Sequence, residues 1–310
     1  MVTYERPDFL TRCLASLADQ RGNIDQVVVV DASASPATID TAYPGAVYVH
    51  TPHLAGWMTR SRNEALRHST GDLLAFIDDD VVVRAGWADA LRHRLADLDV
   101  AAVGGRTCNN QPGEESYDQE IGRLLDDGTL TAGFAALTPG PVDVDHGIGA
   151  NMTFRRTVLA ELGGFRDDYP GTALREDTDI FLRVRRLGHR VVYDPEAAVD
   201  HRPAPHVKGA RFDTRYKFYG RRNHVILLAR HAGAGSPMLR RWIWRQLAAA
   251  MNAGGVVPTA QRLGVTVVGI AWGLAVLPRY AGLKPLPPQR SDATGIELRE
   301  LLARPSTPAG

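Results

Sequence analysis

The chain has 310 residues, of which 44% are hydrophobic and 23% charged, with 36 Lys and Arg against 35 Asp and Glu. This composition is typical of a soluble globular protein with one large or two ordinary domains, and it excludes a wholly disordered, collagen-like or polytopic membrane chain. The two cysteines, Cys13 and Cys108, lack metal-type spacing, and residues 1–10 lack the basic and apolar regions of a signal peptide. We therefore expect a protein of the cytoplasm, a reducing compartment, without a disulfide scaffold.

Short apolar runs alternate with helical patterns along the first hundred residues. Buried strands are expected where β-branched or apolar residues are continuous, and helices where apolar residues recur every three or four positions. The alternation predicts an α/β fold with a mostly parallel central sheet flanked by helices. The expected order is strand 27–31, helix 57–69, strand 73–77, helix 85–98 and strand 100–104.

The second half of the chain changes character twice. Residues 106–145 are polar and Gly-rich, which predicts a long and partly irregular loop segment. Further on we expect a helix at 156–163 ended by the glycine pair 163–164, a helix at 177–187 and a strand at 190–193. After about residue 206 the sequence becomes basic, aromatic and helical, and the stretch from Pro285 onward predicts a loose tail.

Positive charge gathers in one segment. Between His201 and Arg262 there are 12 Lys or Arg and one acid, Asp213. Such a segment is expected to meet an anionic partner, and a membrane surface, a diphosphate and nucleic acid all remain open. Trp242 and Trp244 lie among these basic residues, as in an interfacial membrane helix, although packing against the rest of the protein explains them equally well.

The most apolar run is 263–278, LGVTVVGIAWGLAVLP. As a helix it spans roughly 24 Å, which is less than the roughly 30 Å hydrocarbon core of a bilayer. A helix packed on the protein is the first interpretation. Shallow contact with a membrane and a true span are the alternatives.

Three consecutive acids follow the strand predicted at 73–77. Asp78, Asp79 and Asp80 repel one another unless a cation or hydrogen-bond donors compensate their charge. Ligands bind at this edge of an open α/β sheet, and an Asp-x-Asp pair suits Mg²⁺ or Mn²⁺, which can hold a diphosphate. The alternative is a solvated acidic loop or the N-cap of the next helix.

A second group of acids opens the helix predicted at 177–187. Glu176, Asp177 and Asp179 crowd three carboxylates into one turn. Acids at a helix N-terminus complement its dipole, which is a purely structural role. Crowding also raises carboxylate pKa values, which suits a general base, and both interpretations remain open.

Three further positions fit either a binding site or an ordinary structural role. Asp31 ends the strand 27–31 and can form a turn with the serines that follow or accept hydrogen bonds from a base or sugar. Arg60 and Asn63 share a helix face beside Arg62, where an arginine can bind phosphate or simply lie on the surface. His201 precedes a basic loop and is either structural or a ligand to a metal or diphosphate.

Together and in order, these segments resemble the family 2 glycosyltransferases, which have the GT-A fold. The resemblance covers roughly residues 1–230. We therefore expect a GT-A (Rossmann-like) catalytic domain at 1–205, a basic helical extension at 206–284 and a loose tail at 285–310. Met1 stands where family members have the middle of the first strand, so that strand is expected to be shortened. The matching stretches are VTYERPDFLTRCLASL, VVVVDASAS, GWMTRSRNEAL, LLAFIDDD, GIGANMTFRRTVLAELGGFRDD, REDTDIFLRVRRLGHRVVYDPEAAVDH and YKFYGRRNHVILL.

The resemblance implies a nucleotide-binding role for residues of the N-terminal segments. Thr3 and Glu5 would lie near the nucleoside, although Glu5 replaces an Asn common in the family. Asp31 would bind the nucleobase, and Arg60 with Asn63 would lie close to the donor.

It also implies a metal site. Asp78 and Asp80 would be the two acids of the DxD motif, with Asp79 between them at the nucleotide. Asp80, Asp78 and His201 would then hold a divalent metal, Mn²⁺ or Mg²⁺, at the diphosphate.

The remaining motif residues would surround the reacting sugar. Asp177 would be the catalytic base, with Glu176 beside it. The loop GIGANM at 147–152 would bring Gly149, Ala150 and Asn151 near the donor sugar and the acceptor.

The implied reaction is inverting transfer of a sugar from a UDP-, GDP- or dTDP-sugar to an acceptor hydroxyl, in polysaccharide, glycolipid or other glycoconjugate biosynthesis. The acceptor would be a saccharide or lipid-linked, with peripheral contact to an anionic membrane and no nucleic acid partner. A nucleotidyltransferase of similar α/β fold is one alternative, but the N-terminal region lacks a Gly-rich phosphate loop. A non-catalytic anion- or nucleic-acid-binding protein is another, but it does not explain three acids after a buried strand.

Overall fold

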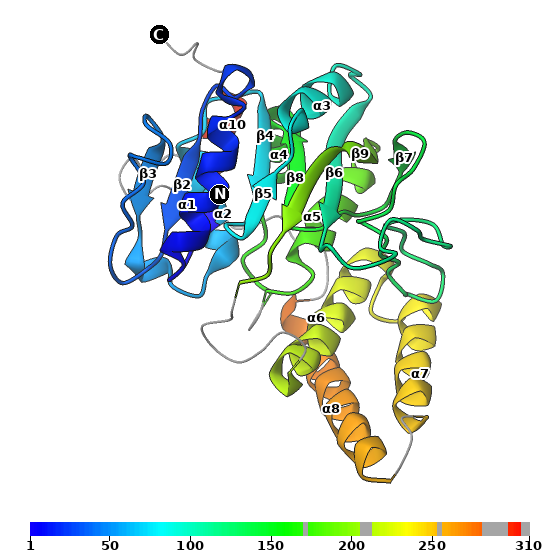
Figure 1. Ribbon diagram of the computed structural model, residues 1–310. Coiled ribbons are helices and arrows are strands. Elements are labelled where there is room, and N and C mark those ends of the chain that lie inside the picture. The colour runs from blue at the N-terminus through cyan, green and yellow to red at the C-terminus, as the bar shows by residue number, and fades with distance from the viewer. Residues whose placement is uncertain (170–172, 205–212, 253–255, 281–296, 305–310) are drawn as a thin grey trace.

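The computed structural model describes residues 1–169, 173–204, 213–252, 256–280 and 297–304. Strands and helices form a mixed α/β body, and three long helices project beyond it (Figure 1). The strands are β1 (Val2–Thr3), β2 (Val28–Asp31), β3 (Val47–His50), β4 (Leu73–Ile77), β5 (Val81–Val83), β6 (Val100–Cys108), β7 (Val142–Asp143), β8 (Asn151–Arg155) and β9 (Arg190–His201). The α-helices are α1 (Pro7–Ala18), α2 (Met58–Arg67), α3 (Trp87–Arg94), α4 (Arg156–Leu162), α5 (Glu176–Arg186), α6 (Thr214–Ala232), α7 (Pro237–Met251), α8 (Val256–Ala275), α9 (Leu277–Tyr280) and α10 (Leu298–Ala303).

The strands form two sheets. The first is parallel, in the order β1-β2-β3. The second has the order β4-β8-β6-β9-β5, with β7 also pairing with β9; here only β6 and β9 are parallel. The predicted α/β class is confirmed. The expectation of a mostly parallel sheet is wrong for the second sheet, because β8 arrives from later in the chain and inserts antiparallel between β4 and β6.

The two sheets meet at the edge where the predicted ligand site lies. An isolated parallel bridge joins Val2 of β1 to Asp78, directly after β4. Strands β1, β2 and β4 therefore run in the same direction, and their carboxyl ends lie together. Thr3, Asp31 and the three acids after β4 all reach this edge, where ligands bind in open α/β sheets.

Hydrophobic packing covers the sheets with helices on two sides. The buried residues of α1 recur at the spacing of one helical face, and together with α3 they pack against β2, β5 and β9. Helices α4, α5 and α10 join a second core around β6 and β8. All nine residues of β6 are buried, including Gly105, where a Cβ would lie 2.3 Å from the carbonyl oxygen of Ala197. Only glycine fits this close approach.

Element boundaries agree with the sequence where a local signal exists. Helix α4 ends at Leu162 and is followed by Gly163 with φ 72°, as the glycine pair predicts. Helix α3 begins later than expected, because Gly86 with φ 80° precedes it. Strands β6 and β9 are longer than predicted, since they pair with each other over most of their length. Such pairing depends on the partner strand, which local sequence does not reveal.

The predicted loose tail contains an ordered element. Helix α10 lies against α4 and α2, with Leu298 and Leu302 buried. The guanidinium of Arg156 donates hydrogen bonds to the carbonyl oxygens of Leu301 and Leu302 at its C-terminal end. The remainder of the predicted tail lies outside the described residues.

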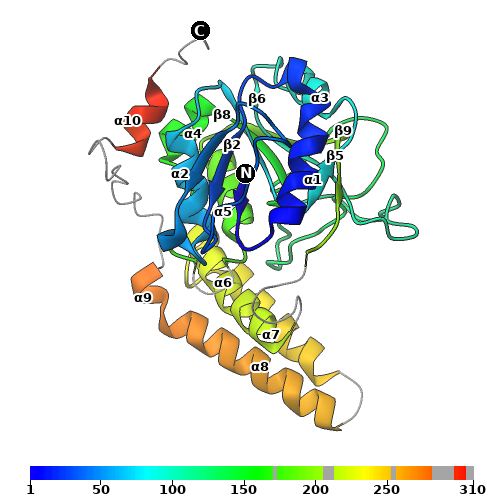
Figure 2. The ribbon, with the colours of Figure 1, turned by 60° about the vertical axis from the view of Figure 1, so that its left-hand side comes forward.

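Helices α6, α7 and α8 form an arm that projects from the carboxyl edge of the sheets (Figures 1 and 2). A third hydrophobic core joins the arm to Tyr169 and to Leu182 of α5. Helix α8 approaches α6 closely at Gly269 and Gly273, where an added Cβ would lie 3.0 Å from Phe218 O and 2.8 Å from Val225 Cβ. The helical extension predicted after residue 206 is thus packed against the rest of the chain along α6.

A buried polar cluster connects α5 to the arm. The carboxylate of Asp179, fully buried on α5, accepts hydrogen bonds from the hydroxyl of Tyr169 at 2.9 Å and from Nε2 of His231 in α6 at 3.0 Å. Arg183 lies 3.9 Å away, and Arg230 stacks over the Tyr169 ring. Burial by itself raises the pKa of Asp179, but the bond from His231 and the nearby cations outweigh it and hold that pKa well below its usual range.

We expect Asp179→Asn to lower the free energy of unfolding by about 3–5 kcal/mol at neutral pH, because it leaves buried cations without their counter-charge. Since the folded-state pKa of Asp179 is depressed, its contribution is present above the unfolded pKa of about 3.9 and is lost as the pH falls below it. Urea denaturation between pH 7 and pH 3 measures the difference between wild type and variant. Asp25→Asn, which removes a surface pair with Arg92, is the control. A difference that is independent of pH would contradict the assignment.

Candidate active site

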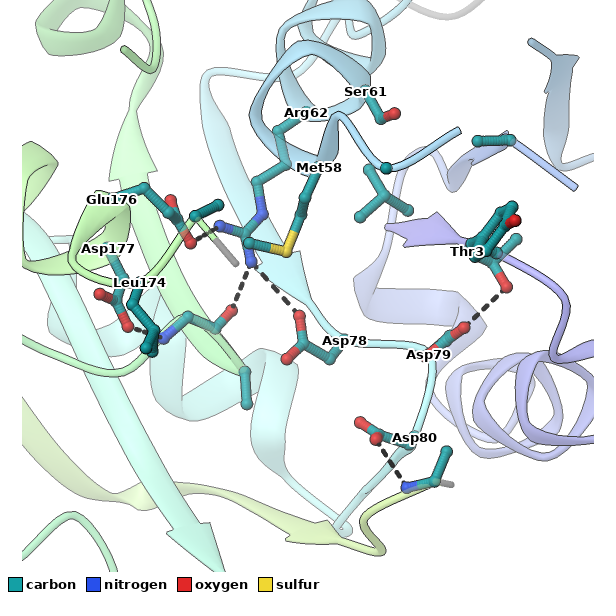
Figure 3. Close-up of a pocket in the computed structure, with 18 of the residues that line it drawn as sticks. Thr3, Met58, Ser61, Arg62, Asp78, Asp79, Asp80, Leu174, Glu176 and Asp177 are labelled. Atoms are coloured by element: carbon teal, nitrogen blue, oxygen red, sulfur yellow. Dashed lines mark hydrogen bonds and ion pairs between the residues drawn. The ribbon is translucent and has the colours of Figure 1, made fainter. Parts of the chain in front are cut away.

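A pocket of about 630 Å³ opens at the carboxyl edge of the sheets. Strand β1 and the segment leading into α2 line one side, the acids after β4 lie at its centre, and the start of α5 lies opposite (Figure 3). The pocket brings together most of the residues that the sequence singled out. These are Thr3, Asp78, Asp79, Asp80, Gly149, Ala150, Glu176, Asp177 and His201.

The centre of the pocket wall is a buried cation, Arg62 of α2. Its guanidinium forms an ion pair with Glu176 and lies 3.3 Å from Asp78 Oδ1 and 3.4 Å from the carbonyl oxygen of Gly149. Burial raises the pKa of Glu176 to about 7, although Arg62 opposes the shift. Arg62 thus links the two groups of acids that the sequence presents 96 residues or more apart.

The three consecutive acids point in different directions (Figure 3). Asp78 faces Arg62. Asp79 turns toward β1, where its carboxylate accepts a hydrogen bond from the Thr3 hydroxyl at 2.7 Å and pairs with Arg6 at 3.2 Å. Burial raises the pKa of Asp79 to about 6, although Thr3 and Arg6 both act to lower it. Asp79 therefore anchors the acidic segment to β1, while Asp78 and Asp80 remain beside the pocket.

Asp80 and His201 have the arrangement of an incomplete cation site. Asp80 Oδ2 accepts the backbone N–H of Ala204, but the buried Oδ1 has no hydrogen bond in the described part of the chain. His201 Nε2 lies 3.4 Å from that oxygen, while its Nδ1 contacts the side-chain oxygen of Asn109 at 3.0 Å. If Nδ1 donates to Asn109 and Nε2 carries no hydrogen, the Nε2 lone pair faces Asp80 and a cation between the two would satisfy both; with a hydrogen on Nε2, His201 instead pairs with Asp80 directly.

The donor set therefore fits a divalent metal. Carboxylate oxygens from Asp78 and Asp80 with an imidazole nitrogen from His201 suit Mn²⁺, and the oxygens suit Mg²⁺. The described residues hold no preassembled group of three or more such ligands, so a bound diphosphate would have to supply the rest of the coordination.

Asp177 lies in the first turn of α5, opposite Asp78 and Asp80 (Figure 3). Its Oδ2 accepts the backbone N–H of Gly149 at 3.1 Å, and its Oδ1 accepts that of Thr178 at 2.7 Å. Two N–H donors orient the carboxylate, which is partly exposed and lines the pocket. Both oxygens keep lone pairs that can accept a proton from a ligand.

Some predicted site residues do not line the pocket because they hold neighbouring loops. Glu5, which is exposed, accepts the N–H of Ala34. The buried carboxylate of Asp31 accepts hydrogen bonds from the Tyr48 hydroxyl at 2.6 Å and from Ser33 N at 2.8 Å. These contacts match the structural interpretation of Asp31, in which it forms a turn with the residues that follow.

Three more predicted residues are also outside the pocket lining. Arg60 is half-exposed and pairs with Asp167. The side-chain amide of Asn63 bonds both backbone groups of Phe165. Asn151 is fully buried and donates to the carbonyl oxygens of Arg106 and Ala197. The amides of Asn63 and Asn151 bond backbone groups and the guanidinium of Arg60 pairs with Asp167, so none of these three side chains lines the pocket.

Arg62 is not among the predicted site residues, although the sequence carries a signal for it. Arg62 lies four residues after Met58 and three before Ala65, so these three residues share one face of the helix predicted at 57–69. A charged residue in the middle of an apolar face points inward and needs a buried partner. Arg60, two positions earlier, lies on another face.

The pocket also receives residues from beyond the N-terminal segments. Leu174 and Arg175 precede α5, and Asp213, Arg215 and Tyr216 belong to the start of α6. Arg175 and Tyr216 begin two of the matching stretches but were given no role there, because their place at the pocket depends on how α6 docks beside α5.

Comparisons with known proteins agree on the family. Residues 1–163 match the family described as Glycosyl transferase family 2. The succinoglycan biosynthesis protein ExoM of Rhizobium meliloti (strain 1021) is 30% identical over 242 residues, which is 74% of this chain and 74% of that protein. The pre-mycofactocin glycosyltransferase of Mycobacterium tuberculosis (strain ATCC 25618 / H37Rv) is 29% identical over 218 residues, which is 69% of this chain but 44% of that protein.

Two solved structures share the fold. One is the mannosyltransferase PcManGT from Pyrobaculum calidifontis in complex with GDP-Man and Mn²⁺, with a TM-score of 0.51 and 21% identity over 90% of this chain and 85% of that one. The other is GalNAc-T7 with UDP, GalNAc and Mn²⁺, with a TM-score of 0.53 and 15% identity over 88% and 54% of the two chains. They confirm the expected GT-A fold. Since the family match spans more than half of the sequence, this chain belongs to glycosyl transferase family 2.

Proposed function

We propose that the protein is an inverting, metal-dependent glycosyltransferase that moves a sugar from a UDP-, GDP- or dTDP-sugar to an acceptor hydroxyl in polysaccharide, glycolipid or other glycoconjugate biosynthesis. The observation that carries the proposal is the shared pocket, in which Asp177 lies opposite Asp78 and Asp80. PcManGT, which has a similar fold, holds GDP-Man and Mn²⁺. Family membership argues against the nucleotidyltransferase and nucleic-acid-binding alternatives.

Asp177 acts as the general base in this proposal. It takes the proton from the acceptor hydroxyl while that oxygen forms a bond to the anomeric carbon, and the bond from that carbon to the diphosphate breaks. Attack from the side opposite the leaving group inverts the anomeric centre. The N–H groups of Gly149 and Thr178 orient the carboxylate, and Glu176 keeps Arg62 beside the pocket.

Asp80, Asp78 and His201 would hold the divalent metal at the diphosphate. When bound, such a metal neutralises the negative charge on the departing nucleoside diphosphate. Support comes from the buried Asp80 oxygen that lacks a hydrogen bond within the described residues and faces His201. Thr3, bonded to Asp79, lies at the side of the pocket where we place the nucleoside.

Asp177→Asn is expected to preserve the fold and to lower the rate of sugar transfer about 10²- to 10⁴-fold, because the amide cannot accept the proton. The measurement is release of nucleoside diphosphate from the sugar nucleotide, with water as acceptor where no other is known. Asp89→Asn, on α3 far from the pocket, is the matched control. Near-full turnover in Asp177→Asn would remove Asp177 from the role of base.

A thermal-shift screen of UDP-, GDP- and dTDP-sugars with Mn²⁺ is expected to identify one nucleotide class that stabilises the protein. Ligand at 100 times its dissociation constant adds about 2.7 kcal/mol to the stability of the folded state. The shift should disappear with EDTA and in Asp80→Asn, because the metal joins the diphosphate to the DxD acids. An equal shift in the presence of EDTA would contradict metal dependence.

The arm offers a surface for an anionic membrane, which would suit a lipid-linked acceptor. Of the two tryptophans expected there, Trp242 is buried whereas Trp244 is 71% exposed. The stretch Thr259–Arg279 is long and apolar enough to cross a membrane, which alone is weak support, and 28% of its most apolar 18-residue window is buried. It packs on α6 and exposes Trp272 and Val268 on the outside. We propose peripheral contact rather than a span, because one face of α8 is already covered by protein.

We place this contact on the inner, cytoplasmic face of the membrane. Both cysteines are buried and free, which suits a reducing compartment. The basic residues of the arm would meet the anionic headgroups. Trp272 is held in this surface from below by the buried Arg222, whose guanidinium lies 5.7 Å from the centre of the Trp272 ring.

We expect the protein to float with vesicles of phosphatidylcholine and phosphatidylglycerol but not with phosphatidylcholine alone, and high salt should weaken binding. Trp244→Ala combined with Trp272→Ala should reduce the bound fraction, because both rings would enter the interface. Leu137→Ala, at another exposed apolar side chain, is the control. Absence of flotation with the anionic vesicles would end the membrane proposal, and flotation that is independent of lipid charge and of both tryptophans would end its placement on this surface.

A further inference from the structure

The turn that leads into α5 is strained. Ala173 (φ 55°) and Arg175 (φ 82°) both adopt the left-handed conformation, which costs a residue with a side chain about 1–2 kcal/mol. Arg175 is the residue at the N-cap of α5, and Asp177 follows in the first turn. Strained backbone of this kind persists only where surrounding contacts hold it.

Two buried residues of α6 supply those contacts. The side-chain amide of Asn223 donates a hydrogen bond to the carbonyl oxygen of Leu174 at 3.1 Å. Nδ1 of His224 accepts one from Nε of Arg175 at 3.1 Å. Asn223 is 0% exposed and His224 is 2% exposed, so water does not compete for either bond. Both residues of the turn that immediately precede the acids are therefore tied to α6.

His224 is itself held on two sides. Its Nε2 lies 2.8 Å from the carbonyl oxygen of Gly128, and its ring stacks on Trp242 of α7 with 4.4 Å between centroids. Arginine can only donate, so Nδ1 must be the acceptor, and Nε2 then carries the hydrogen that Gly128 receives. Burial and the neighbouring Arg175 hold the pKa of His224 well below its usual range, which agrees with this neutral tautomer.

We infer that Asn223 and His224 are positioning residues for sugar transfer, which hold the strained turn 173–175 and thereby set the place of Asp177. The inference rests on the proposed role of Asp177 as the base. Both residues lie on α6, beyond the family match over residues 1–163, so the arm completes the active site instead of merely extending it. The stack on Trp242 extends this support from the catalytic turn to α7.

Two substitutions at His224 separate the positioning role from a general loss of packing. Asn at this position places an oxygen near Nδ1 and retains the acceptor for Arg175, but loses the donor to Gly128. Gln retains a donor near Nε2 and loses that acceptor. We expect His224→Gln to lower nucleoside diphosphate release about 10- to 100-fold, the effect of a misplacement of about 1 Å, with donor affinity unchanged. His224→Asn should recover most of the loss.

Amide hydrogen exchange gives a readout that does not depend on turnover. We expect exchange across 174–178 to rise in His224→Gln and in Asn223→Ala, and to stay near the wild-type level in His224→Asn. His93→Gln, at an exposed histidine of α3, is the matched control for both readouts. If His224→Gln does not fold, Asn223→Ala tests the same turn through its other bond.

A double-mutant cycle tests whether His224 acts through Arg175. If it does, the double variant His224→Gln/Arg175→Met should lose no more turnover than Arg175→Met alone.

Equal effects of Asn and Gln at position 224, or unchanged exchange across 174–178, would overturn the inference. An inactive Asp177→Asn beside a fully active His224→Gln would overturn only the positioning role. A fully active Asp177→Asn would instead overturn the proposed function.

Discussion

One buried cation holds together the acids on which the site depends. The Arg62 guanidinium contacts Glu176, Asp78 and the backbone of Gly149 from a single position on α2. Without it, two carboxylates would face each other in a site of low dielectric, where burial already raises the pKa of both. Because its partners come from β4, from the loop before β8 and from α5, the same guanidinium also fixes how these elements meet.

The rest of the site is arranged around that cation by two further sets of contacts. On one side, the bond between Thr3 and Asp79 fastens the acidic segment to β1 and leaves Asp78 and Asp80 beside the pocket. On the other side, α6 holds the turn before α5 through Leu174 and Arg175. Deeper in the protein, Asp179 and His231 join the same two helices again. The pocket thus lies between a sheet edge and a helical arm that are connected through buried polar groups.

The sequence predicted well whatever depends on local pattern. The order of strands and helices, the glycine end of α4 and the acids after β4 all follow from the spacing of apolar, glycine and acidic residues. Single polar residues carry less information about their role. Asn63 and Asn151 match family motifs, yet each uses its amide to bond backbone from distant segments. A polar side chain beside a strand can serve a ligand or the protein's own backbone, and only the packed structure shows which it does.

The sequence by itself determined the α/β class, the family and the two groups of acids, because each of these depends only on residue types at fixed local spacing. The tertiary structure decided which of the acids share a pocket, since Asp78 and Asp177 meet only through the docking of α5 beside α2. It also decided that β8 runs antiparallel between β4 and β6, that α10 packs within the expected tail, and that Asn223 and His224 reach the turn before α5. Each of these depends on a partner far away in the chain, and the energy of such a contact exists only after the chain has folded.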